Sequence, residues 1–460
     1  MALMKSISGI RGTIGGKPGD NLTPIDVVKF TAAYGSIIKN KGGKKIIVGR
    51  DGRMSGEMVR SLVVNTLIGL GLNVVDLGLS TTPTVEMAVV FEKADGGVIL
   101  TASHNPKQWN ALKLLNEKGE FISAEIGKQV LALAEKEDIL FAGVDELGVY
   151  EMDDTLLETH IDAILTHPLV DKKLIASKNF KVVLDAINSS GAVAVPQLLI
   201  ALGVNNVTVL NAEMHGNFAH NPEPLAEHLV DLCTEVVHQK ADVGIAVDPD
   251  VDRLCFVCDD GSLFGEEYTL VAVADYILTN KKGNTVSNLS STRALRDVTE
   301  KHGGIYYASA VGEVNVVTKM KEVNAVIGGE GNGGVIDPHL HYGRDAMIGI
   351  ALFLTHLAQT GLTVTQLRKT YPDYFMSKNK IDLPKGTDVP AILEKVKAQY
   401  ASYPVNTEDG VKIEFEKSWV HLRASNTEPI IRVYSEAPST IEAEQVATDV
   451  MDRIKKLIPS

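Results

Sequence analysis

The sequence predicts an α/β protein in which three similar α/β domains precede a smaller C-terminal α+β domain. One observation behind this prediction is a recurring order of elements: an apolar strand, a helix, a glycine and a second strand. Another is a change of pattern after residue 370, where strand-like runs precede one closing helix. The length of 460 residues agrees with several domains, because single cores stop growing at about 250–300 residues.

The repeated unit occurs three times. Its strand, helix and second strand are expected at 45–51, 55–71 and 73–78, at 181–185, 192–202 and 207–210, and at 284–287, 293–302 and 305–307. This spacing is typical of the βαβ unit, whose parallel strands form a sheet covered by helices. A loop rich in polar or reactive side chains follows each unit, which favours three similar domains over one large sheet.

The C-terminal segment differs. Strands are expected at 412–415, 419–422 and 430–434, before a closing helix. That helix starts with a capping-box sequence at 439–442 and carries an apolar stripe formed by Val446, Val450, Ile454 and Leu457. A small α+β domain follows from this pattern. The predicted domains are 1–150, 151–255, 256–370 and 371–460, divided at polar or turn-rich joins.

Charge and hydropathy exclude several classes of function. The formal net charge of −13 argues against nucleic acid and against an anionic membrane surface as partners. No apolar run approaches the roughly 20 residues needed to span a bilayer, and residues 1–10 lack the apolar core of a signal peptide. We therefore expect a cytoplasmic protein. The sequence indicates no particular oligomeric state.

Cysteine usage points to a reducing compartment, because Cys233, Cys255 and Cys258 are too few for a disulfide framework. Residues 255–258 form a C-x-x-C motif, which can signal zinc or redox chemistry. Here the motif lies in an expected strand, and no second C-x-x-C or histidine pair completes four ligands. We therefore expect the two cysteines to pack in a core.

A candidate nucleophile follows a short apolar run at 97–100 that predicts a buried strand. Residues 101–106 read Thr-Ala-Ser-His-Asn-Pro, so Ser103 lies at a strand's carboxyl end, where open α/β sheets bind ligands. Asn105 and Pro106 are typical of a turn that would hold the Ser103 hydroxyl away from the sheet. Such turns are also common in ordinary loops, so the hypothesis that Ser103 is a nucleophile depends on loops elsewhere in the chain.

A second loop is rich in carboxylates. Asp248, Asp250 and Asp252 alternate after an apolar run at 243–247, and Arg253 follows them. Hard divalent cations such as Mg²⁺ take oxygen ligands, and an oxygen of a phosphate group is often one of them. The loop therefore predicts a Mg²⁺ site beside a phosphorylated group.

Two further loops suit a sugar and a phosphate. Residues 328–334 read Gly-Gly-Glu-Gly-Asn-Gly-Gly, which lets the backbone approach a ligand while Glu330 and Asn332 bind hydroxyls. Residues 423–429 read Arg-Ala-Ser-Asn-Thr-Glu-Pro between two expected strands, with Arg432 just beyond. A guanidinium, two hydroxyls and turn amides in one hairpin loop suit a dianionic phosphate.

The four loops, in this order and spacing, resemble the α-D-phosphohexomutase family, and residues 8–12 (Ser-Gly-Ile-Arg-Gly) resemble its opening. The resemblance spans nearly the whole chain. It implies mixed, mostly parallel sheets in the first three domains and four domains around a central cleft. It also implies an enzyme that moves phosphate between O1 and O6 of a hexose through a phosphoserine. One Mg²⁺ per chain and a hexose 1,6-bisphosphate primer would be its cofactors.

The resemblance also assigns roles to individual residues. Phosphorylated Ser103 would donate its phosphate to a hexose phosphate, and the bisphosphate would turn over and return its other phosphate. The implied catalytic residues are Ser103, Lys113, Arg11 and His104, and the implied metal ligands are Ser103, Asp248, Asp250 and Asp252. The implied substrate-binding residues are Arg253, Gly312, Glu313, Glu330, Asn332, Arg423, Ser425, Asn426, Thr427 and Arg432. His104 would tune the serine loop through hydrogen bonds.

Two assignments stay open. Some bacterial members have a histidine four residues after the glutamate of the sugar loop, where Gly334 stands here; His339 and His341 could take its proton-transfer role or be surface residues. The second open assignment is the preferred hexose. The glycine-rich loop with residues 343–345 (Gly-Arg-Asp) resembles archaeal-type phosphoglucosamine mutases, and glucose or mannose phosphate is the alternative substrate.

Three other functions fit part of the sequence. An aspartyl-phosphate hydrolase would use Asp248 as nucleophile but leaves the Ser103 and Arg423 loops unexplained. A calcium-binding EF-hand needs glycine at its sixth place and glutamate at its twelfth, where Arg253 and Asp259 stand. A catalytically silent sugar-phosphate sensor would need the same loops as the enzyme, so only an activity assay separates the two.

Overall fold

The computed structural model describes residues 3–6, 9–136, 138–384, 386–425 and 429–458. The chain divides into two compact units: unit 1 consists of Met1–Tyr276 and Asn332–Arg368, and unit 2 of Ile277–Gly331 and Lys369–Ser460. Both units combine sheets with helices, which confirms the predicted α/β class. The four domain boundaries stay a prediction. Among the described residues, no helix is both long and apolar enough to cross a bilayer.

Seven strands form the first sheet of unit 1, in the order β1-β2-β6-β5-β3-β4-β7. They are β1 (Met4–Ser6), β2 (Gly9–Thr13), β3 (Lys45–Arg50), β4 (Asn73–Leu79), β5 (Gly96–Leu100), β6 (Trp109–Leu115) and β7 (Tyr150–Met152). The strand β3 runs parallel to β4 and β5, whereas β6 is antiparallel to β5 and β2. The carboxyl ends of β3 and β5 therefore share one edge of the sheet.

Helices cover both faces of this sheet. They are α1 (Pro24–Asn40), α2 (Gly56–Gly69), α3 (Thr82–Phe91) and α4 (Ala124–Lys136), with a short 3₁₀ helix at Val144–Glu146. Successive residues of a strand point to opposite faces, so Ile46 and Val48 join the core under α1, α2 and α4 while Ile47 joins the core under α3. Threonines begin two of these helices, because the side chains of Thr23 and Thr81 accept N–H groups of the first turns of α1 and α3.

The second sheet of unit 1 has the order β11-β10-β8-β9. Its strands are β8 (Lys181–Asp185), β9 (Asn206–Leu210), β10 (Val243–Val247) and β11 (Leu254–Val257), and only β11 is antiparallel to its neighbour. The accompanying helices are α5 (Leu156–Leu165), α6 (Lys172–Lys178), α7 (Gly191–Ala201), the 3₁₀ helix Ala226–His228 and α8 (Val230–Gln239). Unit 1 also contains β15 (Gly334–Ile336), α12 (Ala346–Thr360), α13 (Val364–Arg368) and most of α9 (Glu266–Asn280).

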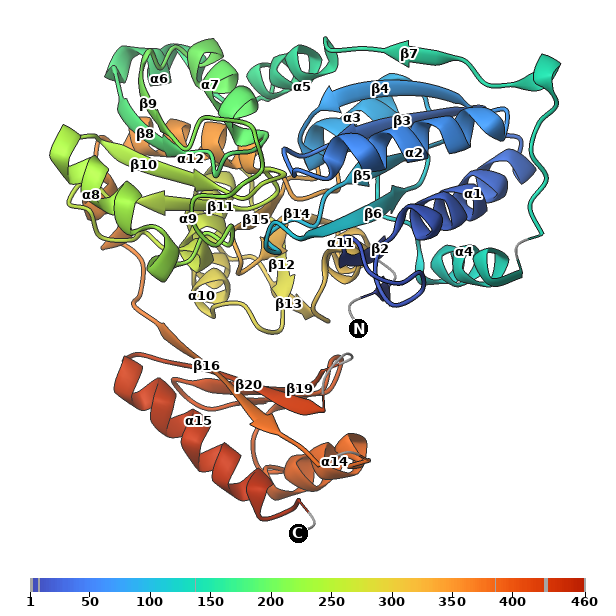
Figure 1. The fold of residues 1–460 in the computed structure, drawn as a ribbon. Helices are drawn as coiled ribbons and strands as arrows, with labels where there is room; N and C mark the ends of the chain where they lie inside the picture. The colour runs from blue at the N-terminus through green and yellow to red at the C-terminus, as the bar shows by residue number, and fades with distance from the viewer. Residues whose placement is uncertain (1–2, 7–8, 137, 385, 426–428, 459–460) are drawn as a thin grey trace. The chain divides into compact units, whose positions relative to one another are not determined.

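Unit 2 holds two sheets. In the first, β12 (Asn284–Asn288) runs parallel to both β13 (Tyr306–Ser309) and β14 (Ala325–Glu330), with α10 (Ala294–Lys301) and α11 (Glu313–Glu322). The second is antiparallel, in the order β16-β20-β19-β18-β17, with α14 and α15 on the same side of it (Figure 1). Its elements are β16 (Phe375–Asp382), α14 (Val389–Gln399), β17 (Val405–Asn406), β18 (Val411–Glu414), β19 (Trp419–Ala424), β20 (Ile430–Ala437) and α15 (Thr440–Lys455).

The predicted elements of the three repeats and of the C-terminal segment are confirmed, with small shifts at their ends. The side chain of Ser439 caps α15 by accepting the N–H of Glu442, and Val450 and Ile454 are buried as the stripe predicts. Cys255 lies in β11 and Cys258 directly follows it; both are buried free thiols. The expectation of core packing for the C-x-x-C motif is therefore confirmed.

Candidate active site

Within unit 1 the predicted serine and aspartate loops meet. Ser103 follows β5 and Asp248 follows β10, and the Ser103 hydroxyl donates a hydrogen bond of 2.7 Å to Asp248 Oδ2. Both loops hold left-handed backbone at residues with side chains, with φ of 49° at Ser103 and 62° at Val251. Such conformations cost about 1–3 kcal/mol each and cluster at functional sites. The two strand ends predicted from the sequence thus form one strained, buried centre.

The three aspartates are fully buried and strongly held. Asp248 Oδ1 accepts the backbone N–H groups of Asp252 and Arg253 at 3.1 Å each. Burial raises the pKa of Asp248 well above its usual value, and the other two aspartates raise it further. Burial would also raise the pKa of Asp252, but Arg344 and Lys113 outweigh it and lower the pKa below its usual value.

Two cations compensate these carboxylates. Lys113 on β6 donates to Asp250 Oδ2 at 2.7 Å and to Asp252 Oδ2 at 3.2 Å, and Arg344 donates to the same oxygen of Asp252 at 2.7 Å. Burial lowers the pKa of Lys113, but Asp250 and Asp252 outweigh burial and raise it. Lys113 therefore keeps its proton. Thr82, at the start of α3, adds a hydrogen bond of 2.6 Å to Asp250 Oδ2.

The aspartate loop can hold a divalent cation. Asp248, Asp250 and Asp252 each offer one carboxylate oxygen, and these atoms lie within 4.8 Å of one another. Asp250 Oδ1 and Asp252 Oδ1 are buried and accept no hydrogen bond from any residue that the structure describes. Buried carboxylate oxygens without donors are costly unless a cation or water meets them. The residues present therefore fit Mg²⁺, which prefers oxygen ligands.

A buried arginine braces the serine loop. Arg53 follows β3 and is 1% exposed, and its Nε lies 3.0 Å from Asp51 Oδ2. Its Nη1 donates to the carbonyl oxygens of Pro106 (2.8 Å) and Trp109 (3.0 Å), and its Nη2 to those of Ser103 and Asn105.

Thr101 adds a second hydrogen-bonded link between Asp51 and the serine loop. Thr101 Oγ1 donates to Asp51 Oδ2 at 2.7 Å and accepts the N–H of Ser103 at 2.9 Å. The turn that carries Ser103 is thus fixed from the end of the neighbouring strand.

Sequence reasoning missed Arg53, Asp51, Thr82 and Arg344 as site residues. The signal for the first two was available, because residues 51–53 follow β3, which is parallel to β5 and ends at the same edge. Thr82 and Arg344 gave no comparable signal, since their contacts join segments far apart in the sequence.

The other residues predicted for catalysis gather around the same loop. Arg11 on β2 donates to Asn105 Oδ1 at 2.8 Å, and His104 Nδ1 lies 3.4 Å from Ser103 Oγ. Burial, and then Arg253 and Arg11, lower the pKa of His104 well below its usual value. His104 is therefore neutral beside the Ser103 hydroxyl. Arg253 is buried, and its Nη1 pairs with Glu223 Oε1 at 2.9 Å.

Unit 2 brings together part of the predicted substrate-binding set. Glu330 is buried at the end of β14, and its Oε1 accepts hydrogen bonds from Asn288 Nδ2 (2.9 Å) and from the backbone N–H of Gly312 (3.1 Å). Arg423 on β19 pairs with Asp409 Oδ2 at 2.7 Å, and that oxygen also accepts the N–H of Val311 at 3.0 Å. Asp409 thus links the arginine loop to the segment that carries Gly312.

The remaining predicted residues have mixed environments. Glu313 is buried at the start of α11, and Arg432 on β20 is exposed and lies opposite Arg423 of β19. In unit 1, Asn332 Oδ1 accepts the N–H of Gly334 at 3.2 Å. The Ser425 N–H donates to the Ile430 carbonyl at 3.1 Å, and Asn426 and Thr427 lie outside the described residues.

The two histidines considered for proton transfer both have partners in unit 1. The His339 ring packs edge-on against His167, with the ring centroids 4.7 Å apart. His341 lies between two carboxylates, with Nε2 3.3 Å from Asp345 Oδ2 and Nδ1 3.4 Å from Glu86 Oε2.

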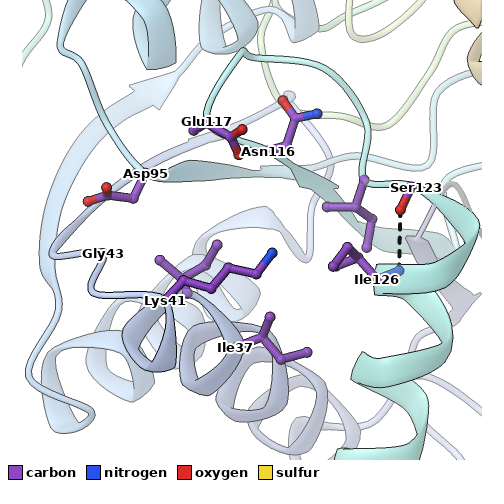
Figure 2. A pocket seen from close by; sticks show the side chains of 10 residues that line it. Ile37, Lys41, Gly43, Asp95, Asn116, Glu117, Ser123 and Ile126 are labelled. Carbon is purple, nitrogen blue, oxygen red and sulfur yellow. Dashed lines mark hydrogen bonds between the residues drawn. The ribbon is translucent and has the colours of Figure 1, made fainter.

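A separate cavity of about 410 Å³ lies near the opposite edge of the first sheet, at the end of α1 and at the loops before β5 and after β6. Figure 2 shows Lys41, Asp95 and Glu117 around it. Asp95 is already engaged, since its Oδ2 accepts the backbone N–H groups of Lys44 and Lys45. These two lysines lie at the start of β3, whereas Arg53 follows the end of β3, so the cavity is not part of the candidate active site.

Comparisons with known proteins agree along the whole chain. Residues 4–140, 158–261, 265–374 and 379–453 match, in turn, the families phosphoglucomutase/phosphomannomutase alpha/beta/alpha domains I, II and III and the C-terminal domain. A Thermococcus kodakarensis protein named phosphoglucomutase/phosphomannomutase is 36% identical over 94% of this chain and 96% of its own length. A Sulfurisphaera tokodaii protein named phosphoglucosamine/phosphogalactosamine mutase is 32% identical over 100% and 99%. The crystal structure of a Burkholderia thailandensis phosphoglucomutase/phosphomannomutase family protein superposes with a TM-score of 0.84 at 25% identity, over 99% of this chain and 98% of that one.

Proposed function

From the premise that the chain belongs to the phosphoglucomutase/phosphomannomutase family, we propose that it interconverts hexose 6-phosphate and hexose 1-phosphate through a phosphoserine at Ser103. The observation that carries this proposal is the hydrogen bond from the Ser103 hydroxyl to Asp248, inside a buried centre of three aspartates. A hexose 1,6-bisphosphate would be the intermediate, and the same compound would prime the serine.

The first transfer breaks the bond between phosphorus and Ser103 Oγ and forms a bond between phosphorus and the free hydroxyl oxygen of the hexose phosphate. After the bisphosphate has turned over, the second transfer breaks the bond between the other phosphorus and its sugar oxygen and re-forms the bond to Ser103 Oγ. Catalysis then rests on positioning and on stabilising charge. The proton leaving the sugar hydroxyl needs an unprotonated acceptor, and the neutral ring of His104 offers one with its Nδ1 3.4 Å from Ser103 Oγ. Lys113 keeps its proton and would stabilise negative charge instead of accepting a proton.

Asp248, Asp250 and Asp252 would hold Mg²⁺, which supplies positive charge against the transferring phosphoryl group when bound. The buried oxygens of Asp250 and Asp252 that accept no hydrogen bond among the described residues support this assignment. Arg11 and Arg253 would bind the reacting phosphate. Burial and then repulsion by Arg253 lower the pKa of Arg11. A bound anion would relieve that repulsion.

The proposed substrate is glucosamine 6-phosphate, with glucose or mannose phosphate as the second candidate. Relatives at 32% identity, from Methanopyrus kandleri and Sulfurisphaera tokodaii, carry phosphoglucosamine mutase names and support the first. The name of the Thermococcus kodakarensis relative at 36% identity supports the second. In unit 2, Glu330 would bind sugar hydroxyls and Arg423 would bind the phosphate that does not react.

The test combines mass spectrometry with steady-state kinetics. The intact mass of the purified protein should show a partly occupied phosphate that is absent from Ser103→Ala, and mutase activity should fall by roughly 10³-fold or more because the covalent route is lost. Ser123→Ala, at an exposed serine of the same unit, is the matched control and should keep both the phosphate and the mutase activity. Comparing kcat/KM for glucosamine, glucose, mannose and N-acetylglucosamine phosphates then identifies the substrate. Wild-type turnover by Ser103→Ala would refute the mechanism.

A further inference from the structure

Four ionisable side chains that the proposed reaction does not use gather inside unit 1. Glu86 comes from α3, His160 from α5, and His341 and Asp345 from the segment that leads into α12. Glu86, His160 and Asp345 are at most 1% exposed at their side chains, and His341 is 9% exposed. We propose that His160, His341 and Asp345 bind one transition-metal ion of the Zn²⁺ class, at a site distinct from the aspartate loop.

The distances between the three ligand atoms suit a metal ion. Asp345 Oδ2 lies 3.0 Å from His160 Nε2 and 3.3 Å from His341 Nε2, and one ligand atom from each of the three residues lies within 4.8 Å of the others. In a tetrahedral zinc site with bonds of about 2.0–2.1 Å, neighbouring ligand atoms are about 3.3–3.4 Å apart. Small side-chain shifts would therefore bring the three atoms onto one ion, with the fourth position open to water.

Other groups already orient each ligand. His160 Nδ1 lies 3.0 Å from Thr84 Oγ1, and His341 Nδ1 lies 3.4 Å from Glu86 Oε2. Asp345 Oδ1 accepts the N–H groups of residues 347 and 348 at the start of α12, at 2.7 and 3.3 Å. Metal-binding histidines commonly pair their second nitrogen with a carboxylate or another acceptor in this way. The two Nε2 atoms and Oδ2 are left facing one another.

The rival explanation for this cluster is that a proton, and not a metal ion, lies between its side chains. His341 has a carboxylate beside each ring nitrogen, and a neutral imidazole carries only one N–H. Without a metal, the ring cannot donate to both carboxylates unless an additional proton is bound in the cluster. With a metal, neutral His341 binds it through Nε2 and donates from Nδ1 to Glu86. The nitrogen-rich ligand set favours Zn²⁺ or a similar ion over Mg²⁺.

The site would stabilise the segment that reaches the candidate active centre. Asp345 directly follows Arg344, whose guanidinium pairs with Asp252 at 2.7 Å. A metal held by His160 on helix α5 and by His341 and Asp345 would fix the backbone on which Arg344 is mounted. The bound metal should therefore raise the melting temperature of the protein, because it binds the folded chain and not the unfolded one.

The first test measures metal uptake by the full chain. Chelator-treated protein is titrated with Zn²⁺ in excess Mg²⁺, which occupies the aspartate loop, and bound zinc is counted by elemental analysis. We expect one Zn²⁺ per chain and a rise in melting temperature, both lost in His341→Ala and in His160→Gln. His167→Gln is the matched control: its buried imidazole lies 3.0 Å from Asp337 Oδ2 but belongs to neither metal-competent cluster found among the described residues, so uptake should persist.

A second measurement uses the wild-type protein alone, in case a variant fails to fold. X-ray absorption at the zinc edge should show scattering from two imidazole rings, whereas zinc in the loop of Asp248, Asp250 and Asp252 would show oxygen ligands. Uptake that survives in His341→Ala but disappears in Asp250→Asn, or no uptake by the wild type, would overturn the proposal. The proposed mutase function is tested separately, because Ser103→Ala should leave zinc uptake unchanged.

Discussion

Replacing Arg53 with methionine should both destabilise unit 1 and slow catalysis, because this one side chain holds the turn that carries Ser103. The guanidinium donates to four backbone carbonyl oxygens between residues 103 and 109 and pairs with Asp51. Methionine keeps the apolar stem but leaves all of these acceptors without their donor. Burial already raises the pKa of Asp51, which the Arg53 charge lowers. Without Arg53, this carboxyl group would be left as an uncompensated buried charge or would take up a proton.

The expected cost follows from the burial of both partners, whose side chains are 0% exposed. Removing one member of a buried, hydrogen-bonded ion pair costs about 3–5 kcal/mol. For a chain of 460 residues, with an unfolding entropy of about 2.1 cal/mol/K per residue, that corresponds to a melting temperature lower by roughly 3–5 °C. Turnover should fall as well, since a misplacement of about 1 Å in a catalytic group can cost about 10²-fold in rate. KM should change little, because Arg53 contacts the backbone of the serine loop.

The assay follows thermal unfolding, kcat, KM and hydrogen exchange of the amides at 101–109 in the same preparations. Arg53→Lys keeps the charge but cannot reproduce the forked contacts, so it should be intermediate. Lys45→Met is the control: Lys45 pairs with Glu92 at 3.0 Å on the surface, and such pairs are worth about 0–1 kcal/mol. Wild-type melting and turnover in Arg53→Met would refute the brace. A lower melting temperature with unchanged kcat would show that Arg53 stabilises the fold without positioning Ser103.

Three further predictions concern buried charge. Lys113→Met removes the cation beside two buried aspartates, so its loss of melting temperature against wild type should be larger in chelator than in Mg²⁺. Glu223→Gln weakens the half-exposed partner of Arg253, so we expect kcat/KM to fall by no more than about 5-fold. Burial lowers the pKa of His421 to about 4 from an ordinary 6.5; the neutral ring therefore contributes stability above pH 6.5 that is lost as pH falls towards 4, up to about 3 kcal/mol. The pH dependence of urea unfolding should be flatter in His421→Asn.

The sequence could place Ser103 and the three aspartates at strand ends because their positions follow a local rule. Ser103 and the three aspartates come directly after short apolar runs, and those runs form β5 and β10. The carboxyl ends of such strands lie where α/β sheets bind ligands. The rule says which residues reach that edge, and their type indicates the chemistry.

The sequence could not show which residues of different segments come into contact at the site. The distance from Lys113 to the aspartates depends on the pairing of β6 with β5 and on how two sheets pack. The cluster of His160, His341 and Asp345 joins segments almost 200 positions apart, and no spacing within the chain announces it. Such contacts are set by tertiary structure, so only coordinates reveal them.

Backbone conformation at the centre runs against local preference, which explains why loop detail was the least predictable part. Serine and valine rarely take positive φ, and a β-branched residue such as Val251 does so at particular cost. Both positions persist because the surroundings hold them: Arg53 binds the Ser103 carbonyl, and the Val251 carbonyl accepts the N–H of Ala346 at 3.2 Å. Strain at Ser103 and Val251 is thus balanced by contacts at the ends of neighbouring segments. A substitution that relieves the strain, such as Ser103→Gly, should therefore raise stability while abolishing the covalent route.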